Sequence, residues 1–151
     1  MPMAATQHST VLVLDDNLGD IDLLSTAWTE AAHDQAIGIH ACTSCDQAMA
    51  WLAGGQPPGR VLSGALVDLM LFDRGGRAAV DMLAEQPLLK QVPIIAWTGI
   101  EVGKRRTDRM TNALRVWKKP RDWTAYADFT LRLYQVLSRR SSGSSARLPT
   151  V

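Results

Sequence analysis

Cysteine is rare in this chain, and long apolar runs are missing from it. The 151 residues include only Cys42 and Cys45. Two cysteines do not form the disulfide framework of a small secreted domain, so we expect a cytoplasmic protein. No apolar run approaches the ~20 residues that a membrane-spanning helix needs. The first residues also lack a basic segment followed by an apolar one, so we expect neither secretion nor insertion into a membrane.

An excess of charge of either sign is also missing. The chain has 16 basic and 15 acidic residues, which gives a formal net charge of +1. No global field therefore draws it to nucleic acid or to a membrane surface, and we expect neither as a partner. Apolar residues make up 46% and charged residues 21%, which is the composition of a folded globular domain.

Short apolar runs alternate along the chain with segments of helical spacing. The predicted strands are residues 10–14, 36–41, 65–68, 93–97 and 114–117. The predicted helices are residues 18–32, a segment that begins at a capping box of Thr43 and Asp46, and residues 78–85, 101–112 and 121–139. Strands that alternate with helices predict an α/β fold, a doubly wound five-stranded parallel sheet of the flavodoxin-like (βα)5 kind. We expect residues 1–9 to be a flexible arm, 10–140 the domain and 141–151 a flexible tail.

Polar side chains gather where these predicted strands end. The first strand ends in Asp15 and Asp16, the third in Asp68, the fourth in Thr98, and Lys119 follows the fifth. Asp68 alone could equally well cap a helix, but in a doubly wound sheet all these ends share one edge. Carboxylates held together there repel one another unless a hard cation such as Mg²⁺ or Mn²⁺ binds them. The set is suited to phosphoryl transfer, with Asp68 as the nucleophile.

Four motifs, in order, give the chain a resemblance to a known family. They are V-L-V-L-D-D-N-L-G-D (Val11–Asp20), L-V-D-L-M-L-F-D-R-G-G (Leu66–Gly76), P-I-I-A-W-T-G (Pro93–Gly99) and K-K-P (Lys118–Pro120). Together they resemble the CheY-like receiver domain of two-component response regulators, over roughly residues 9 to 140. The D-N-x-G-D form of the first motif is similar to that of small stand-alone receivers that work with bacteriophytochrome-type kinases.

The resemblance implies a role for each matched residue. Asp68 is the expected phosphoacceptor, a phosphoprotein site that takes its phosphoryl group from a kinase phosphohistidine. Asp16, Asp15, Asp68 and the backbone carbonyl of Met70 are the expected ligands of Mg²⁺ or Mn²⁺. Thr98 and Lys119 would bind the phosphoryl oxygens.

The resemblance also implies partners and a mode of action. We expect a stand-alone signal-transduction switch in a phosphorelay, with a histidine kinase or phosphotransfer protein as its donor. Beyond its own phosphorylation and slow dephosphorylation, we expect no enzymatic activity. A homodimer through the fourth helix, the fifth strand and the fifth helix is a further expectation, with basic residues from Lys104 to Arg115 on that face and Asp128 as a partner across it.

The chain departs from the family pattern at four positions. Phe72 replaces the usual proline, and Val116, beside Trp117, replaces the usual aromatic switch residue. Met70 and Ile100 are apolar where the family often has polar groups, and we expect them to shield an acyl phosphate. The departures keep open an alternative, a receiver-like interaction module that works without phosphorylation.

Two enzyme classes share parts of the pattern. Cys42 and Cys45 have the spacing of a thiol-disulfide oxidoreductase motif, but two small residues at a strand–helix junction are the favoured interpretation. Phosphatases of the haloacid-dehalogenase type also use a nucleophilic aspartate with Mg²⁺. They need a second aspartate two residues later, where this chain has Met70.

Overall fold

The computed structural model describes residues 8–31, 37–55, 60–71, 76–99 and 115–147. The strands are β1 (His8–Leu14), β2 (Ile37–Cys42), β3 (Arg60–Asp68), β4 (Ile94–Thr98) and β5 (Arg115–Lys118). The helices are α1 (Leu18–Glu30), α2 (Cys45–Ala50), α3 (Gly76–Ala84) and α5 (Trp123–Arg147), with short helical turns at Trp51–Gly55 and Pro87–Leu89. The helix predicted over residues 101–112, and with it most of the expected basic face, lies outside the described residues.

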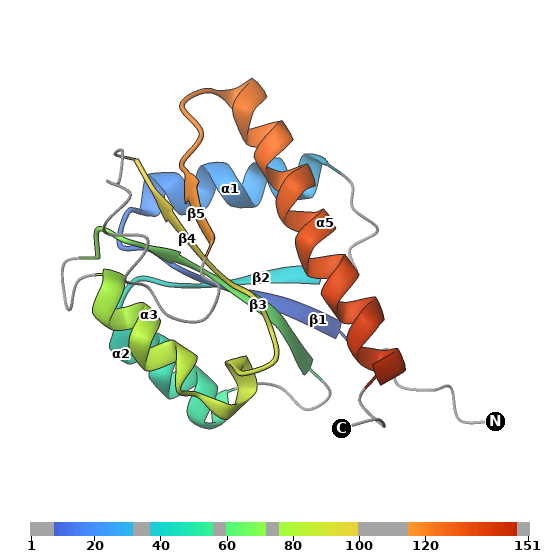
Figure 1. Cartoon of the computed structure of the whole chain (residues 1–151). Coiled ribbons are helices and arrows are strands. Elements are labelled where there is room, and N and C mark those ends of the chain that lie inside the picture. Colours follow the sequence, from blue (N-terminus) through green and yellow to red (C-terminus); the bar gives the residue numbers. More distant parts are fainter. Residues whose placement is uncertain (1–7, 32–36, 56–59, 72–75, 100–114, 148–151) are drawn as a thin grey trace.

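The five strands form one parallel sheet in the order β2-β1-β3-β4-β5 (Figure 1). This order is that of the flavodoxin-like doubly wound fold, so the predicted fold class is confirmed. The chain reverses its direction of winding between β1 and β3. In open sheets of this kind, ligands bind beyond the carboxyl ends of the strands at such a switch point.

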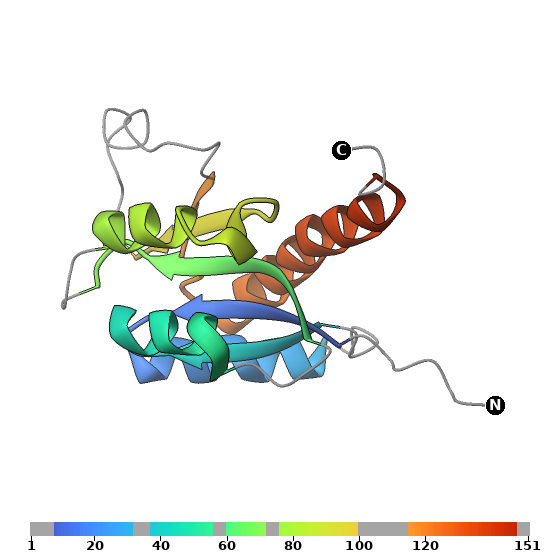
Figure 2. The same cartoon turned by 90° about the horizontal axis from the view of Figure 1, so that it is seen from below.

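Within the described residues, α1 and α5 cover one face of the sheet, and α2 and α3 cover the other. Val11 and Val13 of β1 face the core under α1 and α5, while Leu12 and Leu14 face the core under α2 and α3. All four side chains are fully buried. The view from below shows α2 and α3 in front of the sheet (Figure 2). A strand buried on both faces explains why the apolar run of β1 shows no polar alternation.

The start of α2 differs from the sequence prediction. The capping box predicted at Thr43 and Asp46 is wrong, because Ser44 is the N-cap and its hydroxyl accepts a hydrogen bond from the Gln47 backbone N–H. The Gln47 side chain returns to the Thr43 backbone N–H at 2.9 Å, which leaves Thr43 one residue before the cap. Ser44 and Gln47 thus have the spacing of a capping box one position further on, but the glutamine oxygen accepts from the residue before the cap instead of from the cap itself.

The end of α5 also differs, because the helix continues past its predicted end at Arg139 as far as Arg147. Extending an existing helix adds one hydrogen bond for each residue fixed, so a serine-rich segment can follow a packed helix without a new nucleus. The boundaries of the arm and the tail stay predictions. No helix in the described part of the chain combines the length and apolarity needed to cross a membrane.

Candidate functional site

The carboxyl ends of four strands bring the predicted site residues to one edge of the sheet. Asp68 is the last residue of β3, Thr98 is the last of β4, and Asp15 and Lys119 directly follow β1 and β5. Lys119 is held in place by its backbone N–H, which donates to the Thr98 carbonyl oxygen at 2.7 Å. The parallel topology therefore produces the convergence that the sequence predicts.

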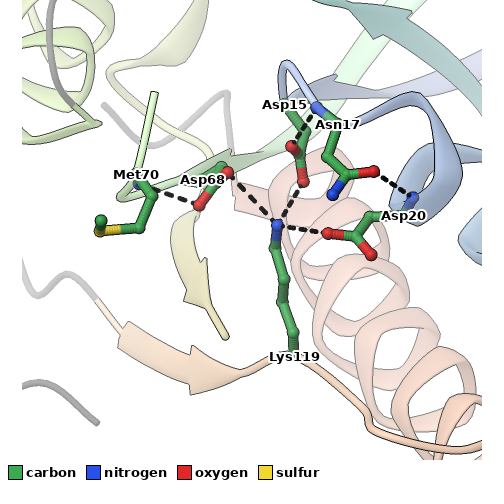
Figure 3. Close-up of polar contacts among 6 residues, drawn as sticks. All are labelled: Asp15, Asn17, Asp20, Asp68, Met70 and Lys119. Carbon is green, nitrogen blue, oxygen red and sulfur yellow. Dashed lines mark hydrogen bonds and ion pairs between the residues drawn. The ribbon is translucent and has the colours of Figure 1, made fainter. Parts of the chain in front are cut away.

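The ammonium group of Lys119 lies at the centre of this cluster (Figure 3). Its Nζ is 2.8 Å from Asp15 Oδ2, 2.7 Å from Asp20 Oδ2 and 3.3 Å from Asp68 Oδ2. Asp15 and Asp68 are almost completely buried, whereas the Asp20 side chain is 26% exposed. One cation thus contacts three carboxylates that come from different strand ends and from α1.

Each of the two buried aspartates is held by a local turn of the same kind. Asp15 Oδ1 accepts a hydrogen bond from the Asn17 backbone N–H at 2.8 Å, and Asp68 Oδ1 accepts one from the Met70 backbone N–H at 2.9 Å. In each residue the other carboxylate oxygen faces Lys119. This turn, from an aspartate side chain to a backbone amide two residues later, orients one oxygen of each carboxylate locally, while Lys119 contacts the other oxygen.

Burial shifts the pKa values in the cluster. Burial raises the pKa of Asp15 to about 6, although the Lys119 hydrogen bond opposes the shift. For Lys119, burial would lower the pKa, but the contacts with Asp15 and Asp20 outweigh it and the pKa is raised. The site therefore carries a permanent cation beside a carboxylate that is costly to ionise.

A divalent cation fits this arrangement of oxygen atoms. Asp15, Asp16 and Asp68 each offer a carboxylate oxygen, and these three oxygens lie within 4.8 Å of one another. Hard cations such as Mg²⁺ and Mn²⁺ prefer such ligands and relieve the repulsion between them. Burial is the main cause of the raised pKa of Asp15, so a bound cation would stabilise the ionised form of this carboxyl.

An open depression of about 570 Å³ gives access to the cluster. Its lining residues are Asp16, Asn17, Leu18, Asp20, Asp68, Met70, Gly99 and Lys119. The Met70 side chain is about half exposed and points away from the carboxylates (Figure 3). Thr98 is 2% exposed and lies directly before Gly99 in the lining.

The structure thus brings together Asp15, Asp16, Asp68 and Lys119, as predicted. Phe72 and Ile100 lie outside the described residues. Sequence reasoning missed one contact, that of Asp20 with Lys119. Asp20 is the last residue of the first motif, and its place in the first turn of the predicted helix, directly after a predicted strand end, was the available indication.

Two tryptophans flank the cluster. Trp97 lies opposite Asp68 in the β3–β4 register, and Lys119 Nζ is 4.8 Å from the centre of its ring. Trp117 lies opposite Trp97 in the next pair of strands, and both rings contact Phe129 of α5 at 5.6 Å between centroids. Trp97 therefore belongs to both the sheet core and the wall of the site.

The two cysteines form no disulfide, and their side chains are buried in the core under α2 and α3, although the Cys42 carbonyl oxygen accepts a hydrogen bond from the Asp15 backbone N–H at 3.1 Å. Cys45 Sγ contacts Met82 Sδ at 3.9 Å, and burial raises the pKa of Cys42. A raised thiol pKa lowers the thiolate fraction that redox chemistry requires. The geometry supports two packed core residues, the favoured sequence interpretation.

No family model and no curated protein sequence matches the chain. Several solved structures do. The Mn²⁺-bound response regulator Rcp1 is 17% identical, with 83% of this chain and 91% of that one covered and a TM-score of 0.65. The phosphorylated cyanobacterial phytochrome response regulator RcpA is 18% identical, with 85% and 92% covered and a TM-score of 0.68. A response regulator receiver domain from Rhodospirillum rubrum is 22% identical, with 82% and 89% covered and a TM-score of 0.64. The chain has the fold of the CheY-like response regulator receiver domains.

Proposed function

We propose that this chain is a stand-alone response regulator receiver that accepts a phosphoryl group on Asp68. One observation carries the proposal: the Lys119 ammonium lies 3.3 Å from Asp68 in a cluster where the oxygens of Asp15, Asp16 and Asp68 are within 4.8 Å of one another. This is the arrangement that phosphoryl transfer to a carboxylate needs, because the cation neutralises charge that develops on the phosphoryl oxygens.

The chemistry follows from the position of Asp68. A carboxylate oxygen of Asp68 forms the new P–O bond while the P–N bond of a donor phosphohistidine breaks. The electron pair of that bond stays on the donor's ring nitrogen. Lys119 is already within reach of the acceptor and would bind a phosphoryl oxygen, and Thr98 at the end of β4 would bind another.

A divalent cation, Mg²⁺ or Mn²⁺, would be held by Asp15, Asp16, Asp68 and the Met70 carbonyl oxygen, and it would supply positive charge to the phosphoryl oxygens. The Asp15 and Asp68 orientations are fixed by their backbone hydrogen bonds, so these ligands are preorganised. The solved structures described as Mn²⁺-bound and as phosphorylated, both with the same fold, support this assignment.

The output we propose is a change of protein contacts rather than turnover of a substrate. The donor would be a sensor histidine kinase or a phosphotransfer protein in the cytoplasm. Phosphorylation adds charge at the strand ends and would rearrange Thr98 and its neighbours. The fourth helix, β5 and α5 are the proposed homodimer face, on which Asp128 of α5 is exposed.

Phosphorylation by a small donor tests the proposal. The intact mass of the protein is measured after incubation with Mg²⁺ and acetyl phosphate, beside an Asp68→Asn variant and an Asp22→Asn control. Asp22 is an exposed carboxylate on α1. We expect the mass of one phosphoryl group to be added to the wild type and to the control, and none to Asp68→Asn.

The opposite result has a clear meaning. If the wild type gains no mass while a receiver of known activity does so under the same conditions, Asp68 is not a phosphoacceptor. The chain would then be a receiver-like interaction module that works without phosphorylation.

A further inference from the structure

Asp20 makes the shortest contact with the site lysine. Asp20 Oδ2 is 2.7 Å from Lys119 Nζ, compared with 2.8 Å for Asp15 and 3.3 Å for Asp68. Asp20 is not part of the group of carboxylates whose oxygens could share one metal ion. Its charge is therefore directed at the lysine rather than at a cation site.

The first turn of α1 places Asp20 in this position. The Asn17 side chain caps the helix and accepts a hydrogen bond from the Asp20 backbone N–H at 3.1 Å. A Cβ atom at Gly19 would lie 3.2 Å from that Asn17 oxygen, so the absence of a side chain at this position leaves room for the cap. The capped turn thus orients Asp20 toward the centre of the site (Figure 3).

The charge of Asp20 also acts on a side chain of α5. Tyr126 of α5 is buried, and burial raises its pKa to about 12, with the charge of Asp20 as the next cause. Asp20 lines the open depression and its side chain is 26% exposed, so it is accessible from the same side as Asp68. A phosphoryl group on Asp68 would enter the same space.

We propose that Asp20 is a positioning residue that holds Lys119 in the unphosphorylated protein and loses it to the phosphoryl group. The inference rests on the proposed function of Asp68. Lys119 has three carboxylate partners, and each competes with the oxygens of an incoming phosphoryl group. The Asp20 contact therefore stabilises the unphosphorylated state and raises the donor concentration that is needed to leave it.

The test compares the acetyl phosphate concentration that half-phosphorylates the wild type, Asp20→Asn, Asp20→Glu and the control Asp22→Asn, all with Mg²⁺. Removal of the Asp20 charge is expected to lower this concentration about fivefold, the upper range for a partly exposed ion pair. Asp20→Glu retains the charge and is expected to return the value toward that of the wild type. Asp22→Asn removes the same charge from the same helix without a contact to Lys119, so its value should stay at that of the wild type.

A second measurement does not depend on phosphorylation. A double-mutant cycle of Asp20→Asn and Lys119→Gln on the unfolding of the unphosphorylated protein measures the coupling of the two side chains. We expect the unfolding equilibrium constant of the double variant to differ about threefold from the value that the two single variants would give if their effects were independent.

The outcomes separate the two proposals. If the wild type accepts no phosphoryl group, the proposed function of Asp68 is overturned. The proposed transfer of Lys119 from Asp20 to the phosphoryl group is then overturned as well. A different result is that the wild type is phosphorylated while the Asp20→Asn variant needs the same acetyl phosphate concentration as the wild type, or a higher one, for half-phosphorylation. That result overturns only the inference about Asp20. Independent effects in the double-mutant cycle also overturn it, because Asp20 then does not hold Lys119.

Discussion

The ionised form of Asp15 suits the proposed metal site but lowers the stability of the folded protein. Its side chain is fully buried, and burial raises its pKa from 3.8 to about 6. Because the folded state then binds the proton more tightly than the unfolded state, ionisation of Asp15 destabilises the folded protein. At neutral pH the carboxylate is charged, so a cation beyond Lys119 would stabilise it.

A pH dependence of stability follows. In the metal-free protein, the contribution of Asp15 to the free energy of unfolding falls as the pH rises from about 4 to 6, by about 3 kcal/mol in total. Asp15→Asn removes this contribution. The measurement is urea unfolding of the wild type and the variant at pH 4 and pH 7.5 in EDTA. The change in the free energy of unfolding between the two pH values is compared for the two proteins. An equal pH dependence in the two proteins would contradict the assignment.

The site residues that lie at the ends of strands could be predicted from the sequence. Asp15, Asp68 and Lys119 follow apolar runs, and the parallel fold brings such positions together. Asp20 was not found, because it lies on a helix and its contact with Lys119 depends on how α1 is oriented against the sheet. Periodicity in a sequence identifies the face of a helix but not the angle at which it packs.

At the scale of elements, β3 and α5 lie close together at Gly64. A Cβ atom there would lie 2.6 Å from Leu137 Cδ2 and 2.9 Å from the Pro93 carbonyl oxygen. The leucine side chain can move, but the backbone carbonyl is fixed because it accepts a hydrogen bond from the Ala65 N–H. The absence of a side chain at residue 64 therefore allows α5 to pack on the sheet.

A single methyl group tests this contact. Gly64→Ala is expected to destabilise the protein by about 2 kcal/mol, because the added carbon overpacks the junction of β3, β4 and α5. Gly38→Ala is the matched control, since a Cβ atom at Gly38 of β2 would have no neighbour within 4 Å. Denaturant unfolding of both variants gives the comparison. A Gly64→Ala variant as stable as Gly38→Ala would show that both the Pro93 carbonyl and Leu137 of α5 can move to make room.

Element types could be predicted more reliably than element ends. The strands and helices within the described residues appear in the predicted order. The start of α2 was placed one residue early because Thr43 and Ser44 are both good caps, and Gln47 decides between them through its contacts. The end of α5 at Arg147 could not be predicted, because helix extension over Ser and Gly depends on the preceding packed turns.

At the scale of the whole molecule, the fold could be predicted because the sheet is buried on both faces. The uninterrupted apolar runs, separated by helical spacing, leave a doubly wound parallel sheet as the simplest arrangement. The pKa of Asp15 and the sharing of Lys119 among three carboxylates could not be predicted, since both depend on burial and distances that arise only in the assembled protein.

A metal ion should therefore stabilise the whole domain. At about 100 times its dissociation constant, Mg²⁺ is expected to raise the melting temperature at pH 8 by about 8 °C, and EDTA should reverse the rise. The rise should be smaller at pH 5, because protons then compete for Asp15. Thermal unfolding of the wild type and of Asp16→Asn measures it. An equal rise in Asp16→Asn would place the bound ion elsewhere.

The contact of the Lys119 ammonium with the Trp97 ring links the intrinsic fluorescence of this tryptophan to the state of the site. The indole is completely shielded from solvent and lies opposite Asp68 in the sheet, with the ammonium 4.8 Å from its ring centre. Indole emission responds to the electric field across the ring, so any displacement of the lysine alters the colour or intensity of that emission. We therefore expect native fluorescence to change with the occupancy of the site, and a Trp97→Phe variant to lose that change.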